Sequence, residues 1–72
     1  MKLTNFKIEH DYVFDLFFED GTHKVIDLEF LIKSKVTKDE LITASIDKDW
    51  GCLEFKDGMV DINPTTLYKL AS

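Results

Sequence analysis

Residues 12–28 read YVFDLFFEDGTHKVIDL and carry the clearest secondary-structure pattern in the chain. From Tyr12 to Phe18 every second residue is large and apolar, which is the period of a β-strand. The Asp20-Gly21 dipeptide, typical of hairpin turns, comes next, and residues 22–28 then have the composition of a second strand. This pattern predicts an antiparallel hairpin.

The pairing register of this hairpin follows from the loop that keeps one face apolar. A two-residue loop would pair Phe14 with Asp27, an aromatic ring with a carboxylate. A three-residue loop over residues 19–21 pairs Phe14 with Ile26 instead. We therefore predict the three-residue loop, a type I turn in which Gly21 takes the left-handed conformation that glycine adopts without a steric penalty.

The remaining segments complete a single α+β domain over residues 1–72. Turn signals and changes of hydrophobic period predict the order β-β-β-α-β-β-(β)-α, with a mainly antiparallel sheet in a two-layer arrangement. The expected segments are a strand over 5–10, a helical turn capped by Asp27, a short helix with a Thr37–Glu40 capping box, strands over 44–47, 52–55 and 59–62, and a terminal helix beginning at Asn63-Pro64. The register of the last short strand is left open.

The aromatic side chains divide between an expected core and a second face of the hairpin. The expected core phenylalanines are Phe14, Phe18, Phe30 and Phe55. Val13 and Phe17 point to the opposite face, and a two-layer domain of this size should not cover both faces of its sheet. Either a helix bends over that second face or another chain covers it.

Two further aromatic residues are candidates for contact with a partner. Trp50 lies in a predicted turn, where it is either a lid over the edge of the core or an interface anchor. Tyr68 lies on the terminal helix. The candidate interface residues are Val13, Phe17, Trp50 and Tyr68.

Composition excludes several classes of function. The chain has 72 residues and a formal net charge of −5, and its nine basic residues are all lysines. An acidic chain without arginine is poorly suited to phosphate backbones, guanine edges or anionic membranes, so we expect no nucleic-acid or membrane partner. No apolar run approaches the roughly 20 residues of a membrane span. A single cysteine and the lack of a signal-peptide core at the N-terminus favour the cytoplasm.

No group of residues in the sequence forms a recognisable catalytic or metal-binding motif. His10, His23 and Cys52 are the only histidines and cysteine, too few for a structural zinc site, and Cys52 is expected to be half-buried in a strand. We expect no cofactor, no metal and no enzymatic activity.

Asp27 and Asp61 are the candidates for a polar site, because each lies within an apolar segment. A buried carboxylate there would have a raised pKa and could act as a base. Alternatively, each aspartate accepts backbone N–H groups just before a helix. A minimal ligand-binding or enzymatic domain that uses these carboxylates is the alternative to a binding module.

Several short motifs follow one another in an order that resembles a known family. They read Phe18-Glu19-Asp20-Gly21, Val25-Ile26-Asp27-Leu28, Leu53-Glu54-Phe55-Lys56-Asp57-Gly58, Asp61-Ile62-Asn63-Pro64 and Leu67-Tyr68. This order resembles the short, mostly bacterial proteins grouped as domain of unknown function 2442. It is also similar to the N-terminal α+β domain of longer proteins that carry a helix-turn-helix segment. Phe55 stands where that family usually has tryptophan, and residues 58–64 are one residue longer than its commonest version.

The resemblance implies an α+β fold without an established catalytic residue. It also implies a gene often located beside that of another very small protein, in toxin–antitoxin-like pairs. Together with the acidic charge and the second apolar face, it predicts a non-catalytic protein-interaction module. The expected partner is a small basic protein or a second copy of the chain.

Overall fold

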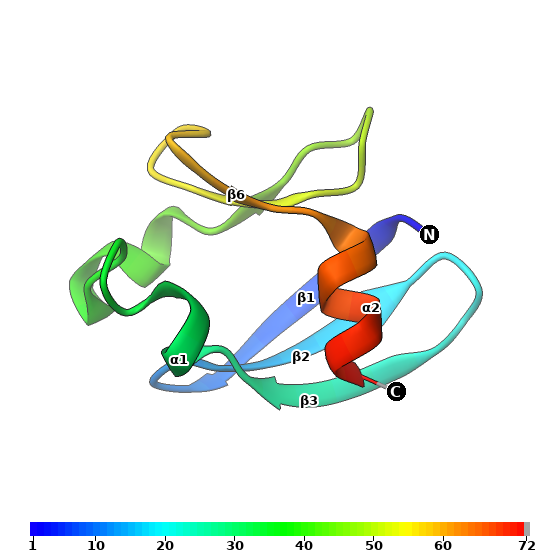
Figure 1. Cartoon of the computed structure of the whole chain (residues 1–72), viewed down its shortest axis with the longest axis horizontal. Coiled ribbons are helices and arrows are strands. Elements are labelled where there is room, and N and C mark those ends of the chain that lie inside the picture. Colours follow the sequence, from blue (N-terminus) through cyan, green and yellow to red (C-terminus); the bar gives the residue numbers. More distant parts are fainter. Residues whose placement is uncertain (72) are drawn as a thin grey trace.

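Two separate three-stranded antiparallel sheets form the framework of the protein (Figure 1). The computed structural model describes residues 1–71. The first sheet has the order β1 (Leu3–His10), β2 (Val13–Phe18), β3 (His23–Asp27), and the second has the order β4 (Ser45–Ile46), β5 (Leu53–Phe55), β6 (Val60–Ile62). The helix α1 (Glu29–Ile32) and the 3-10 helix η1 (Lys38–Thr43) connect the sheets, and α2 (Pro64–Ala71) follows the second. The predicted α+β class with antiparallel pairing is confirmed, and β1 begins two residues before the predicted strand.

The predicted register of the β2–β3 hairpin is confirmed. Phe14 lies opposite Ile26. The N–H of Gly21 donates to the carbonyl of Phe18 at 3.0 Å, which closes a turn in which Gly21 has φ +88°. The apolar face therefore specifies the pairing, since a shift of one residue would turn the Phe14 side chain to the solvent.

Polar side chains at the helix starts take the predicted positions. Asn63 Oδ1 accepts a hydrogen bond of 2.8 Å from the N–H of Thr65, directly after Pro64 opens α2. Glu40 Oε1 accepts 2.9 Å from the N–H of Thr37, the Glu40 side-chain contact of the predicted capping box. These contacts satisfy backbone donors that the first helical turn leaves without an intrahelical partner.

The hydrophobic core lies between the two sheets, and an aromatic contact joins them. Phe14 is fully buried, and its ring meets that of Phe55 edge to face, with centroids 6.0 Å apart and an interplanar angle of 85°. Leu67 of α2 is also fully buried. The hydroxyl of Tyr12 donates to the carbonyl of Val36 at 2.6 Å, which ties the chain after α1 to the first sheet.

The prediction that Phe30 belongs to the core is wrong, because its side chain is 72% exposed. The helix α1 has a single turn, and the residues that face the core are Leu28, just before the helix, and Ile32 at its end, both buried. Residues four apart share a helix face, so Phe30, midway between them, points to the other side.

Gly51 lies where the start of β1 meets the β4–β5 turn. Its carbonyl accepts a 3.1 Å hydrogen bond from the N–H of Leu3. Gly51 has φ +71°, and a Cβ atom placed on it would lie 2.5 Å from Cβ and 2.7 Å from Cα of Lys2. This position therefore requires glycine both for its backbone conformation and for the close approach of the neighbouring chain.

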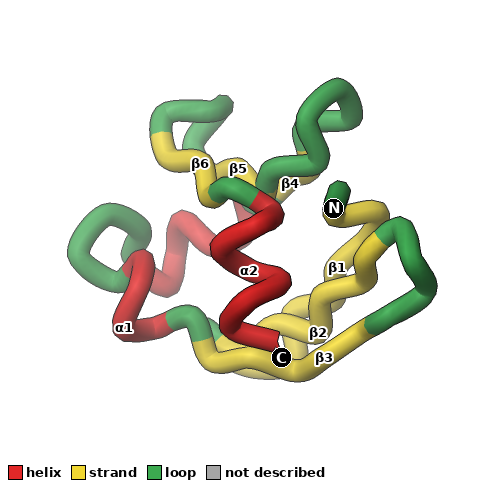
Figure 2. Tube along the Cα trace, turned by 45° about the vertical axis from the view of Figure 1, so that its right-hand side comes forward, coloured by secondary structure: helices red, strands yellow, loops and turns green. Residues whose placement is uncertain are grey.

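All helices and the second sheet lie on the same side of the first sheet (Figures 1 and 2). The opposite side of that sheet is not covered by any segment within residues 1–71.

Over the same residues, the structure contains no helix with the length and apolar character needed to cross a bilayer.

Candidate functional site

The uncovered side of the first sheet, here called the outer face, is the most extensive candidate surface. Phe14, Leu16 and Phe18 point into the core, so the residues between them in β2 point outward. Strand pairing then places the outward residues of β3 and β1 beside them. The outer face consists of Asn5, Lys7, His10, Val13, Asp15, Phe17, His23, Val25 and Asp27.

Apolar side chains on the outer face surround Asp15. Val25 of β3 lies directly opposite Asp15 and is 58% exposed. Val13 and Phe17 are the next outward residues along β2 on either side of Asp15, and both are half-buried. Val25 is diagonal to both Val13 and Phe17, a position close enough for contact on one sheet face, whereas Val13 and Phe17 are four residues apart along β2 with Asp15 between them.

A stacked aromatic pair and a carboxylate contact organise one end of the outer face. The rings of Phe17 and His23 stack with centroids 4.9 Å apart and an interplanar angle of 13°. His23 Nδ1 lies 3.2 Å from Asp15 Oδ1. The Asp15 side chain is only 13% exposed, although no other layer formed by residues 1–71 covers it, because its neighbours on the sheet enclose it.

Trp50 lies far from the outer face. It is at the tip of the β4–β5 turn, which extends from the opposite side of the molecule in Figure 1, and it is 72% exposed. It borders an open cavity together with Cys52, Asp61 and Pro64. A lid over the core would be buried against it, so the exposure argues against that interpretation.

Tyr68 holds α2 against the β2–β3 hairpin. Its ring meets that of Phe18 edge to face, with centroids 5.0 Å apart, and its hydroxyl donates to Asp20 Oδ2 at 2.8 Å. Hydrogen bonds from the N–H of Thr22 and from the Tyr68 hydroxyl lower the pKa of Asp20. The structure thus places Val13 and Phe17 on the same sheet face, and Trp50 and Tyr68 elsewhere.

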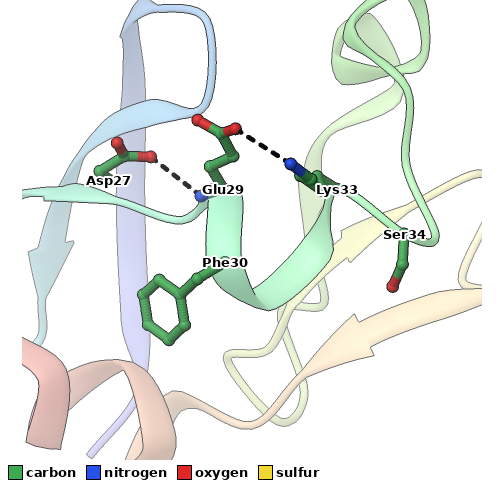
Figure 3. A pocket seen from close by; sticks show the side chains of 5 residues that line it. All are labelled: Asp27, Glu29, Phe30, Lys33 and Ser34. Carbon is green, nitrogen blue, oxygen red and sulfur yellow. Dashed lines mark hydrogen bonds and ion pairs between the residues drawn. The ribbon is translucent and has the colours of Figure 1, made fainter.

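Asp27 and Asp61 are both solvent-exposed, so the description of them as buried carboxylates is wrong. They do not form a common site. Asp27 Oδ1 accepts 2.9 Å from the N–H of Glu29, as the alternative interpretation of a backbone-capping aspartate predicts. Figure 3 shows this contact at the start of α1, where Asp27, Glu29, Phe30, Lys33 and Ser34 line one pocket. Glu29 Oε2 lies 3.5 Å from Lys33 Nζ there.

The acidic and thiol groups of the protein are dispersed. Over residues 1–71, no three His, Cys, Asp or Glu side chains are grouped closely enough to hold a metal ion. Cys52 is half-buried, as expected. Burial raises the pKa of its thiol, and the negative charges of Asp61, Asp47 and Glu54 raise it further.

The raised pKa of Cys52 predicts that its thiol reacts slowly with alkylating agents. Because the thiolate is the reactive form, alkylation of the folded protein by iodoacetamide at pH 8 should be several-fold slower than that of the urea-unfolded chain. Asp61→Asn removes one negative charge and should partly restore the rate, whereas Asp39→Asn, on η1, serves as the control. Equal rates for folded and unfolded protein, measured by mass spectrometry, would contradict this prediction.

Sequence inspection alone did not identify Asp15, His23 and Val25 as parts of the candidate surface. The predicted β2–β3 register contained the necessary signal, because it places Val25 opposite Asp15 and His23 opposite Phe17. Carrying that register through to the outer face would have added the three residues to Val13 and Phe17.

Comparison with known proteins gives a family but no activity. A family model described as a protein of unknown function, DUF2442, matches residues 3–72. No curated protein and no solved structure matches the chain.

Proposed function

The chain belongs to the DUF2442 family, and we propose that it is a non-catalytic protein-interaction module that binds its partner through the outer face. The observation that carries the proposal is the group formed by Val13, Phe17 and Val25 on an uncovered sheet. Exposed apolar side chains that lie beside polar ones on one face are characteristic of protein interaction sites. The polar neighbours Lys7, Asp15, His23 and Asp27 would give such a contact its specificity.

We propose a small basic protein as the partner. The chain carries a formal net charge of −5, which favours approach of a positively charged protein. Asp15 lies at the centre of the apolar group, where a lysine or arginine of the partner would meet a carboxylate already shielded from water. The arrangement fits a cytoplasmic pair of small proteins encoded side by side, as in toxin–antitoxin-like gene pairs.

A titration followed by NMR tests the proposal. The purified product of the adjacent small gene is added to 15N-labelled chain, and amide shifts are expected to concentrate at Val13, Asp15, Phe17 and Val25. Phe17→Ser should weaken binding at least about tenfold, which corresponds to roughly 1.4 kcal/mol. Ile42→Ser is the matched control, because Ile42 is an exposed apolar residue on η1.

Each outcome of the titration bears on the proposal. Thermal melts of both variants establish that they remain folded at the temperature of the titration. The absence of binding, shifts concentrated on another face, or equal weakening by the Ile42→Ser control would each contradict the outer face as the binding surface.

A further inference from the structure

The outward edge of β3 has free hydrogen-bonding groups. The N–H of Phe18 donates to the carbonyl of Thr22 and the N–H of Leu28 donates to that of Tyr12, both at 2.9 Å. Along a strand of an antiparallel sheet, the backbone N–H and C=O groups of successive residues point alternately to one neighbouring side and to the other. The even-numbered residues of β3 therefore bond to β2. The peptide groups of His23, Val25 and Asp27 therefore point away from the sheet, and nothing else within residues 1–71 bonds to them.

The opposite edge of the first sheet is blocked by the protein itself. Two register irregularities interrupt β1 against β2, and bulges of this kind hinder pairing with a further strand. Asn5 Oδ1 accepts the N–H of Phe6 at 2.9 Å, and the carbonyl of Gly51 accepts that of Leu3. By contrast, β3 pairs with β2 in continuous register over its whole length, so it presents a regular edge.

The sequence of β3 is self-complementary about Val25. The strand reads HKVID, with a basic residue on one side of the central valine and an acidic residue at the matching distance on the other. If two such strands run antiparallel with Val25 opposite Val25, His23 of each copy faces Asp27 of the other on the outer face. Displacing the register by two residues in either direction would set His23 or Asp27 against a valine.

We propose that a second copy of this chain pairs with β3 edge to edge, about a twofold axis at Val25, to form one continuous six-stranded sheet. All the outward peptide groups of residues 23, 25 and 27 then find partners, which gives six backbone hydrogen bonds. In each copy, His23 Nδ1 faces Asp15 of its own chain, and Nε2 is directed to Asp27 of the other copy. The inference deepens the proposed function, because pairing joins two outer faces through their Val25 side chains.

Disulfide trapping tests the register. Directly opposed residues of a hydrogen-bonded antiparallel pair have Cα atoms about 5.5 Å apart, a distance that a disulfide can bridge. In a Cys52→Ser background, Val25→Cys should form a covalent dimer under mild oxidation. Lys24→Cys is the matched control, since diagonal positions are about 7–8 Å apart, and it should cross-link at least about tenfold more slowly.

Sedimentation equilibrium tests the association without cross-links. The dissociation constant of the dimer of the unmodified chain should be below about 1 mM. Val25→Lys sets like charges opposite each other and should raise the dissociation constant at least about tenfold, whereas Val25→Thr should leave it within about twofold. Val25→Pro should also abolish the dimer yet remain folded, since the lost N–H points outward.

Failure of this inference differs from failure of the proposed function. A chain that stays monomeric at the highest concentration, or that cross-links equally at positions 24 and 25, overturns the edge pairing. Amide shifts on the outer face of such a monomer during the partner titration would still support the interaction module. Conversely, a dimer trapped at Val25 without any partner-induced shift would support the edge pairing alone.

Discussion

Replacing Phe14 with alanine is expected to remove a large part of the stability of this protein. Phe14 is fully buried and contacts both Phe6 and Phe55, with ring centroids 5.9 and 6.0 Å away. Truncating a buried phenylalanine costs about 3–5 kcal/mol, because apolar contact is lost and a cavity is left. A chain of this length has a total stability of roughly 4–11 kcal/mol. Urea unfolding followed by circular dichroism at 25 °C measures the loss.

The same substitution at Phe30 provides the matched control. Phe30→Ala removes the same atoms from a side chain that is already mostly in water, so the free energy of unfolding should change by less than about 0.5 kcal/mol. A comparable loss at both positions would show that Phe30 is packed. A negligible loss at Phe14 would contradict the position of the core between the sheets.

Replacing Gly51 with alanine should also be strongly destabilising, at about 3 kcal/mol or more. Alanine would have to adopt a left-handed conformation and would place its Cβ against the Lys2 backbone, where a few tenths of an ångström of movement cannot relieve the overlap. The β1–Gly51 hydrogen bond would then lengthen or break. Urea unfolding gives the free-energy change, and the amide exchange of Leu3 reports on that bond.

Gly21→Ala separates the cost of the left-handed backbone conformation from the cost of the steric overlap with Lys2. Gly21 also has a positive φ, but a Cβ atom there would meet nothing within 4 Å. Its loss should therefore be the conformational cost alone, about 1 kcal/mol. Equal losses at the two glycines would mean that the close approach of Lys2 adds nothing.

Local patterns predicted the first hairpin and the last helix because their determinants are close in sequence. The hairpin has a strict apolar alternation and a turn that only one loop length satisfies, and Asn63-Pro64 both caps and opens α2. The separation of the strands into two sheets was not predictable in the same way. It depends on contacts between residues far apart in the chain, such as Phe14 with Phe55.

The register of β6 could not be predicted from the sequence. Leu53 lies opposite Ile62 and Phe55 opposite Val60, so the connecting loop includes Lys56 and Asp57, both with positive φ. Non-glycine residues rarely adopt this conformation without help from the surrounding structure. Here the N–H of Lys56 donates to Thr43 Oγ1 at 2.8 Å, a tertiary contact with η1 that no local pattern reveals.

The candidate site was predictable only in part, for a related reason. The alternation of β2 identifies Val13 and Phe17 as outward-facing. Whether anything covers them depends on the packing of every other element. Likewise, Asp27 lies in an apolar segment, yet the strand parity that buries Ile26 beside Phe14 turns Asp27 to the solvent.

The Leu3–Gly51 contact also has a kinetic consequence. The β1–β2–β3 meander needs only short loops and can form early, but docking of the β4–β5 turn on the first strand closes a loop that includes most of the chain. Closure of that loop is expected after the folding transition state. Interactions at the Leu3–Gly51 contact would then affect the unfolding rate of the native protein more than its folding rate.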